Sequence, residues 1–225
     1  MYVNIAVLKE TQPHEKRVAL VPSVVSKMNK LGTIAKSQHG KISGTERETS
    51  AGDAGIAMRY ASSVIIVPGY GLAAAQGQQK LYEFVKLLIA TKVSVKFAIH
   101  SVAGRMPGQM NVLLAEAGVP YNLIFQLDEI NTEFAATDVV LVIGANDVVH
   151  PTARTEKSAP ISGMPILHAD KAKEVYVNKR GQGKGYSGIV NELFYEPNCN
   201  MVFGDAQAVL TKMIEAVRGL SAAAA

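Results

Sequence analysis

Six short, largely apolar runs lie between residues 63 and 203, and each ends at a glycine or at polar residues. They cover residues 63–67, 93–99, 121–127, 138–143, 174–178 and 200–203. Runs that are apolar at nearly every position are typical of strands buried on both faces of a parallel sheet. Helical segments between them would supply the crossover connections that parallel strands need. The sequence therefore predicts an α/β fold with a doubly wound, parallel, six-stranded sheet of the Rossmann-like type.

The helical segments are indicated by their periodicity. The helix expected after the first strand has an apolar stripe at i, i+3, i+4 and i+7, formed by Leu81, Phe84, Val85 and Leu88. Residues 110–117 are also predicted to be helical. A last helix carries apolar residues at helical spacing over 206–217, and Asp205 stands where its N-cap is expected.

Composition excludes several classes of protein. The chain has 225 residues, a net charge of +4 and a single cysteine, Cys199, so a disulfide framework and a cysteine-based zinc site are ruled out. Its five histidines lack metal-ligand spacing, so no metal is expected. The surplus positive charge is spread along the chain, so a nucleic-acid partner is not indicated. No apolar run approaches the ~20 residues of a bilayer span, and charged residues interrupt any signal peptide near the N-terminus.

The turn after the first predicted strand has the pattern GxGxxA, formed by Gly69, Tyr70, Gly71, Leu72, Ala73 and Ala74. In a dinucleotide-binding turn, the first glycine permits the tight turn and the second lets the backbone approach a pyrophosphate. The small last residue lets helix and strand pack closely. Its place after an apolar strand favours a dinucleotide site, with a purely structural turn as the alternative.

The second predicted strand ends at His100 and Ser101, without the acid that NAD-binding folds use for the ribose 2′-OH. A 2′-phosphate instead requires fixed positive charge, which Lys179 and Arg180 supply at the end of the fifth strand. If they hold that phosphate, the dinucleotide lies across the sheet flipped end for end, that is, opposite to its orientation in an ordinary Rossmann fold. The alternative is that both are solvated cations after an edge strand.

The glycine-rich loop 181–188 follows these two cations in sequence, and we interpret it as a lid over the cofactor. Two further strand ends have functional residues. Arg105 lies after the second strand and could hold a phosphate or an amide oxygen. Asp147 lies after the fourth strand near the expected pyrophosphate, where like-charge repulsion makes it a candidate for a shifted pKa. Its alternative role is that of a loop carboxylate capping a turn.

From about Gly44 to the last helix, the chain resembles the NADP(H)-binding domain (domain III) of proton-translocating nicotinamide nucleotide transhydrogenase. The matching segments are 61–71, 102–108, 110–117, 128–131, 142–147 and 204–206. The resemblance implies that NADP(H) lies flipped, that Lys179 and Arg180 bind the 2′-phosphate, and that Arg105 lines the nicotinamide side. Asp147 matches the acid that couples nucleotide state to proton movement. The family usually has serine where this chain has Gly181.

Pattern and resemblance together predict Asp147 and Arg105 as the residues closest to the chemistry. The predicted cofactor contacts are Gly69, Tyr70, Gly71, Ala73, Ala74, Val102, Ala103, Gly104, Arg105, Met106, Pro107, Gly144, Ala145, Asn146, Asp147, Val148, Gly163, Met164, Lys179, Arg180, Gly181, Gln182, Gly183, Lys184, Gly185, Tyr186, Gly204, Asp205 and Ala206.

Four parts are expected along the chain. Residues 1–32 resemble the start of the transhydrogenase NAD(H)-binding domain I and of alanine dehydrogenase. Residues 33–55 form a linker, although part of 50–60 is compatible with a helix. Residues 56–220 form the NADP(H)-binding domain, and 221–225 a tail.

The resemblance implies a component that exchanges hydride directly between NADPH and NAD⁺, the latter bound on a partner. The implied partners are the NAD(H)-binding domain I, expected as a dimer, and the membrane domain. The implied location is the soluble face of an inner membrane, on the bacterial cytoplasmic or mitochondrial matrix side. Two alternatives stay open: a self-contained NADP-dependent dehydrogenase, with His100 as its candidate proton donor, and a non-enzymatic NADP(H)-binding module.

Overall fold

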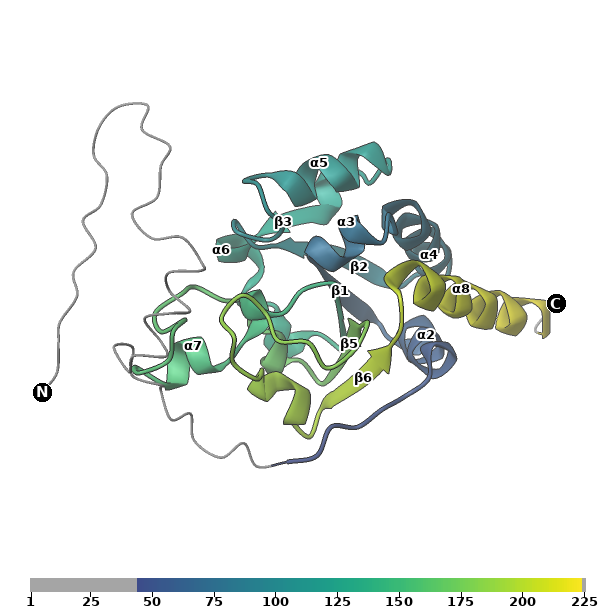
Figure 1. Ribbon diagram of the computed structural model, residues 1–225. Helices are drawn as coiled ribbons and strands as arrows, with labels where there is room; N and C mark the ends of the chain where they lie inside the picture. Colours follow the sequence, from purple (N-terminus) through teal and green to yellow (C-terminus); the bar gives the residue numbers. More distant parts are fainter. Residues whose placement is uncertain (1–43, 224–225) are drawn as a thin grey trace, which may run out of the picture. The chain divides into compact units, whose positions relative to one another are not determined.

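The fold is built on one parallel sheet. The computed structural model describes residues 44–223. Within them, six parallel strands are arranged in the order β3-β2-β1-β4-β5-β6 (Figure 1). The strands are β1 (Ser63–Pro68), β2 (Ser94–Ile99), β3 (Ile124–Gln126), β4 (Val139–Ile143), β5 (Glu174–Lys179) and β6 (Cys199–Phe203). The predicted Rossmann-like α/β fold is confirmed, and its strand order reverses between β1 and β4.

Both faces of the sheet are buried, which explains the nearly continuous apolar strands. In β1, Val64 and Ile66 belong to one hydrophobic cluster, while Ile65 and Val67 belong to the cluster on the opposite face. The first cluster is covered by the longer helices α2 (Ala51–Tyr60), α4 (Gln78–Ala90), α5 (Gln109–Glu116) and α8 (Ala206–Ala223).

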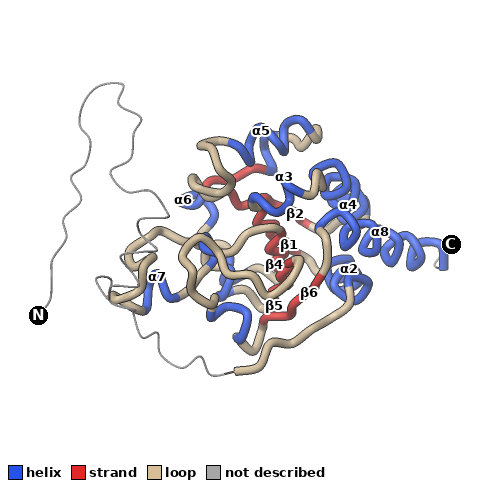
Figure 2. The backbone as a smooth tube through the Cα atoms, viewed as in Figure 1, coloured by secondary structure: helices blue, strands red, loops and turns tan. Residues whose placement is uncertain are grey.

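Short helices and loops cover the second face (Figure 2). They include α6 (Leu127–Ile130), α7 (Thr152–Thr155) and 3-10 turns at Phe134–Ala136, Asp147–Val149, Ala169–Lys171 and Glu192–Tyr195. Phe134, Leu193 and Phe194 are buried on this side. The backbone on this face is irregular, and most of these short helices end after a single helical turn. A further 3-10 turn, Tyr121–Leu123, packs against the first cluster through Leu123.

Two elements differ from the prediction. The glycine turn leads into a separate five-residue helix, α3 (Tyr70–Ala74), and the apolar stripe lies on α4. Gln76 adopts a left-handed conformation with φ 53°, and the Gly77 N–H bonds back to the Leu72 carbonyl, which ends α3. The third strand is also shorter than predicted, because a 3-10 turn precedes it and a capping box between Gln126 and Glu129 starts α6.

The described domain begins before the predicted boundary at residue 56. Glu48 pairs with Met201 of β6, and α2 starts at Ala51, inside the predicted linker. At the other end, α8 extends to Ala223, within the predicted tail. The fragment 1–32 lies outside the described residues. None of the helices described is both long and apolar enough to cross a membrane.

Asp138 joins the starts of β1 and β4. Its carboxylate accepts hydrogen bonds from the Ser62 N–H at 2.8 Å and the Ser63 N–H at 3.1 Å, and from Lys173 at 2.7 Å. The Asp138 N–H in turn donates to the Ser63 hydroxyl at 3.0 Å. The hydrogen bond from Lys173, followed by those from the backbone, lowers the pKa of Asp138 below its ordinary value.

We expect Asp138→Asn to lower the free energy of unfolding by about 1.5 kcal/mol at pH 7. A carboxyl whose pKa is lowered by folding stabilises the protein above its unfolded pKa, and this contribution disappears as the pH falls through the folded pKa. The difference between the two proteins in urea unfolding should therefore shrink below about pH 4. Lys173→Ala should cost less, because the Lys173 side chain is 66% exposed. A difference that persisted unchanged to about pH 2 would contradict this assignment.

Candidate functional site

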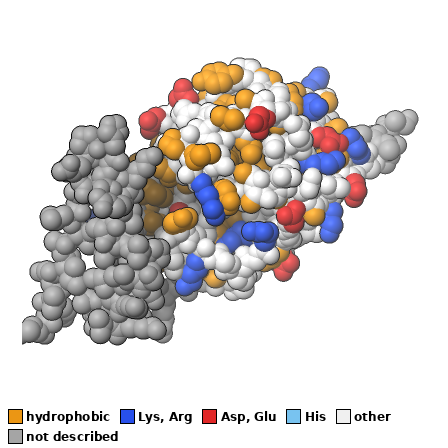
Figure 3. Space-filling view, turned by 45° about the horizontal axis from the view of Figure 1, so that its top comes forward, with side chains coloured by type: hydrophobic (Ala, Val, Ile, Leu, Met, Phe, Trp, Pro, Cys, Tyr) orange, Lys and Arg blue, Asp and Glu red, His pale blue; other side chains and the backbone are white. Residues whose placement is uncertain are grey.

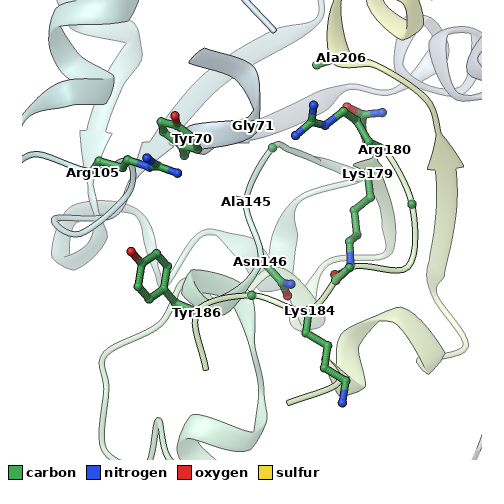
Figure 4. Close-up of a pocket in the computed structure, with 16 residues that line it drawn as sticks. Tyr70, Gly71, Arg105, Ala145, Asn146, Lys179, Arg180, Lys184, Tyr186 and Ala206 are labelled. Carbon is green, nitrogen blue, oxygen red and sulfur yellow. The ribbon is translucent and has the colours of Figure 1, made fainter. Parts of the chain in front are cut away.

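A cavity of about 820 Å³ opens at the carboxyl ends of β1, β4 and β5 (Figure 4). This is where open parallel sheets bind their ligands, outside the point at which strand order reverses. The cavity is lined by Tyr70, Gly71, Gly104, Arg105, Gly144, Ala145, Asn146, Asn178, Lys179, Arg180, Gly181, Gly183, Lys184, Gly185, Tyr186 and Ala206.

The floor of the cavity is made by two turns whose backbones touch. The Gly71 N–H donates to the Gly144 carbonyl at 2.9 Å, and the Gly69 N–H donates to the Ile143 carbonyl at 2.9 Å. A Cβ added to Gly71 would lie 2.7 Å from the Gly144 Cα, and one added to Gly69 would lie 2.4 Å from the Gly144 oxygen. Glycine is therefore required on both sides of this contact, for packing as well as for the tight turn.

Lys179 and Arg180 lie together at one end of the cavity, where β5 ends (Figure 4). The Lys179 ammonium donates to the Gly183 carbonyl at 2.5 Å and lies 4.5 Å from the centre of the Phe194 ring. Burial lowers the pKa of Lys179, and the carboxylates of Glu46 and Asp147 oppose that shift. Arg180 is exposed to solvent. The pair offers an anion one partly buried and one exposed cation.

The opposite end of the cavity is aromatic and basic. The Arg105 guanidinium lies 4.1 Å from the centre of the Tyr70 ring, within the range of a cation–π contact. In Figure 4, Tyr186 lies on the same side of the cavity as Arg105 and Tyr70, and its side chain is 99% exposed. Arg105 is held in place by its own N–H, which donates to the Gln109 side chain at 2.6 Å.

Asp147 holds the glycine-rich loop and does not line the cavity. One carboxylate oxygen accepts the Ser187 N–H at 2.9 Å, and the other accepts the Ser187 hydroxyl at 2.8 Å. A Cβ at Gly185 would lie 2.3 Å from the same carboxylate, so the loop passes directly over it. The alternative role in which Asp147 caps a turn is thus present in the structure. The contribution of Ser187 was not predicted, because its partner lies 40 residues away in sequence.

The structure brings 15 of the 29 predicted cofactor contacts to one cavity, and it places the other 14 outside its lining. Those outside are Gly69, Ala73, Ala74, Val102, Ala103, Met106, Pro107, Asp147, Val148, Gly163, Met164, Gln182, Gly204 and Asp205. Asp205 caps α8 by accepting the Gln207 N–H at 3.0 Å, as predicted. Gln182 turns toward Glu46, and Gly163 lies in the loop after α7.

Asn178 is a lining residue that the sequence analysis missed. Its buried side-chain amide donates to the carbonyls of Val202 at 3.0 Å and Gly204 at 3.1 Å. It thereby connects the end of β5 to the turn that starts α8. The available signal was an asparagine next to the end of a largely apolar strand, where a polar side chain needs hydrogen-bond partners.

His100 is committed to structural hydrogen bonds. It is buried, its Nδ1 accepts the Val102 N–H at 3.1 Å, and its Nε2 lies 2.6 Å from the Pro165 carbonyl. Nδ1 is therefore an acceptor, and the single proton of the neutral ring lies on Nε2, where it donates to Pro165. Both ring nitrogens are used, so His100 is poorly placed to donate a proton to a substrate.

Comparison of the sequence with known proteins finds relatives among NAD(P) transhydrogenase beta subunits. The model of the family described as NAD(P) transhydrogenase beta subunit matches residues 19–216, beginning inside the fragment 1–32. The NAD(P) transhydrogenase subunit beta of Rhodospirillum rubrum is 54% identical over 168 residues, covering 75% of this chain and 36% of that protein. The same subunit from a named strain of that organism gives the same values.

A solved structure from Mycobacterium smegmatis, described as that of a thiamin diphosphate-dependent enzyme, has 14% identity and a TM-score of 0.45. It covers 81% of this chain and 30% of that one. The chain spans about a third of the length of the transhydrogenase subunits that it matches. The family match over most of the chain, together with the cavity at the switch point of the sheet, shows that this chain belongs to the NAD(P) transhydrogenase beta-subunit family.

Proposed function

We propose that this domain binds NADP(H) in the 820 Å³ cavity and presents its nicotinamide for direct hydride exchange with NAD⁺ on a partner domain. The observation that carries the proposal is the pair Lys179 and Arg180 at the end of β5, lining a cavity that crosses the switch point. A 2′-phosphate is the group that distinguishes NADP(H) from NAD(H), and paired cations are suited to bind it.

The distribution of side chains supports the flipped orientation. Figure 4 places Arg180 and Lys179 on one side of the cavity and Arg105 and Tyr70 on the other, with Gly71 and Ala145 between them. With the 2′-phosphate at the β5 end, the pyrophosphate would cross the glycine floor. The nicotinamide would then lie toward Arg105, on the side of β2.

The residues present fit such a ligand. The volume lies in the range of about 300–1,000 Å³ that is usual for ligand pockets. The floor at Gly71 and Gly144 exposes backbone instead of side chains, which allows a close approach. A Cβ added at Gly181 or Gly183 would have no atom within 4 Å, so the loop has room to follow the ligand.

When bound, the nicotinamide supplies the redox chemistry, and no side-chain acid or base is required for direct hydride exchange. The chain's own contribution is to orient the nicotinamide and to exclude water from the site. Lys179 and Arg180 fix one end of the ligand, and Arg105 with Tyr70 borders the other. The loop 181–188 covers the site, and Asp147 anchors that loop through Ser187.

We further propose that Asp147 links proton occupancy to loop position. Both of its oxygens act as acceptors for Ser187, and protonation would remove the carboxylate charge and turn one oxygen into an O–H donor, so that these hydrogen bonds would no longer be charge-assisted. Proton binding would thus weaken the anchor of the loop. This role supports a contribution to proton coupling without proton transfer to the nucleotide.

The partner domain is proposed to dock beside Arg105. Val102 is 61% exposed and Met106 65% exposed, and both flank the turn that carries Arg105. Figure 3 shows hydrophobic side chains interspersed with basic and acidic ones on the visible face of the molecule. The proposed partners are the NAD(H)-binding domain and a membrane domain, which would place this domain at the soluble face of an inner membrane.

The proposal is tested by titrating the full chain, stripped of nucleotide, with NADPH and with NADH. Nicotinamide fluorescence is a clean signal because the chain contains no tryptophan. We expect NADPH to bind at least ~100-fold more tightly, a difference of about 2.7 kcal/mol. Equal affinities would reject the 2′-phosphate site.

The two alternatives are separated by hydride transfer. Oxidation of NADPH by a small carbonyl substrate without a partner would favour a self-contained dehydrogenase. Tight NADPH binding without transfer, even after a transhydrogenase NAD(H)-binding domain is added, would favour a binding module. Transfer only in the presence of that domain is the result that we expect.

A further inference from the structure

A carboxylate from the segment that precedes α2 reaches the glycine-rich loop. Residues 47–49 run beside β6, with the Met201 N–H donating to the Arg47 carbonyl and the Thr49 N–H donating to the Met201 carbonyl at 2.9 Å. One residue earlier, the Glu46 carboxylate accepts a hydrogen bond from the Gln182 side chain at 2.7 Å. Residues 136 positions apart in sequence are thus joined at the loop over the cavity.

Glu46 lies behind Lys179 as seen from the main cavity. A small cavity of about 60 Å³ is lined by both residues and by Phe194 and Tyr195. Lys179 lines this small cavity and the main cavity, as do Asn146, Gly183 and Lys184, so it forms part of the wall between them. The Glu46 charge acts on Lys179 from one side, and the proposed 2′-phosphate would act on it from the other.

Two carboxylates influence the Lys179 ammonium, and they differ in how they are engaged. Asp147 has both oxygens bonded to Ser187. Glu46 accepts a hydrogen bond from Gln182, and it also acts on the neighbouring Tyr195 hydroxyl, whose pKa is raised by burial, by the Glu46 charge and by a hydrogen bond to Glu46. Glu46 therefore brings a negative charge to a basic site without belonging to the cavity lining.

We propose that Glu46 is a specificity-determining residue, which weakens NADP(H) binding by placing a negative charge beside the lysine that receives the 2′-phosphate. The proposal rests on the proposed function, because it requires that phosphate to bind Lys179 and Arg180. A neutral side chain at position 46 leaves more of the Lys179 charge available to the phosphate. NADH has no 2′-phosphate, so its affinity should be insensitive to the change.

The test compares Glu46→Gln with the unchanged full chain. Glutamine keeps an acceptor oxygen and nearly the same shape, so the main change in the variant is the loss of the negative charge. At about 20 mM salt we expect the Kd for NADPH to fall about fivefold, with the Kd for NADH unchanged. At about 1 M salt the gain should shrink but not vanish, because salt screens a close, partly buried pair of charges less than it screens exposed ones.

Two further variants separate charge from mechanical support. Gln182→Ala breaks the hydrogen bond and keeps the Glu46 charge, so it should not tighten NADPH binding. Glu48→Gln removes a carboxylate from the same segment, two residues away and outside the lining of both cavities, and should change neither affinity. These controls follow the same titration at both salt concentrations.

The outcomes distinguish this inference from the proposed function. Unchanged or weaker NADPH binding in Glu46→Gln would overturn it while the unchanged chain still preferred NADPH. An equal gain in Gln182→Ala would also overturn it, since that result assigns the effect to loop geometry. If the unchanged chain showed no preference for NADPH, the proposed function itself would fail.

Discussion

Replacing Gly144 with alanine is expected to lower the free energy of unfolding of this domain by about 4 kcal/mol. Gly144 has φ +72°, a conformation that residues with a Cβ rarely adopt. The added Cβ would lie 2.2 Å from the Leu72 nitrogen and 2.7 Å from the Gly71 Cα. These are backbone atoms of the turn after β1, so they cannot move aside without disturbing the strand pairing.

Gly163 provides a matched control. Its φ of +77° is almost the same, but no atom lies within 4 Å of the place that an added Cβ would occupy. Gly163→Ala should therefore cost only the left-handed strain, about 1 kcal/mol. Urea unfolding followed by far-ultraviolet circular dichroism measures both differences. Equal losses in the two variants would show that conformational strain, and not the contact between the two turns, makes Gly144 necessary.

Arg180→Ala is expected to weaken NADPH binding about 100-fold and to leave NADH binding unchanged. Arginine binds phosphate through several planar donors at fixed positive charge, and alanine supplies neither. The Arg180 side chain is exposed, so its removal should not alter the stability of the fold. Fluorescence titrations with both nucleotides, together with a thermal unfolding curve, separate the two effects.

Lys212→Ala is the control for net charge, since it removes an exposed cation from α8 outside the cavity lining. It should change NADPH binding only slightly, through long-range electrostatics that salt screens. Comparable losses in Lys212→Ala and Arg180→Ala would assign the preference to the overall field of the protein. A parallel loss of NADH affinity in Arg180→Ala would instead indicate that Arg180 contacts a group common to both nucleotides.

The features that could be predicted were local in origin. Residues 63–67 and 138–143 are apolar because strands there are buried on both faces of the sheet. The structure has β1 and β4 at these two places. Asp205 was recognisable as an N-cap because capping depends on residues next in sequence. The positions of Lys179 and Arg180 followed from the rule that ligands lie at strand ends, which needs only the strand order.

The features that were missed depend on contacts distant in sequence. The break between α3 and α4 depends on a left-handed Gln76, a conformation that glutamine rarely adopts. Asn178, Ser187 and Glu46 acquire their roles from partners 24, 40 and 136 residues away, respectively. No local pattern distinguishes Ser187 and Glu46 from ordinary surface residues.

The interlocked glycines have a consequence for how this protein can change. Because a side chain at Gly69, Gly71 or Gly144 would clash with the backbone of the facing turn, substitutions at these three positions cannot adjust ligand preference without damaging the fold. Selectivity must therefore be set at the rim, by residues such as Arg180 and those of the loop 181–188, where no packing constraint operates at Gly181 or Gly183. Folding and discrimination are thus assigned to separate residues. Libraries of rim variants should consequently yield altered cofactor preference from protein that still folds.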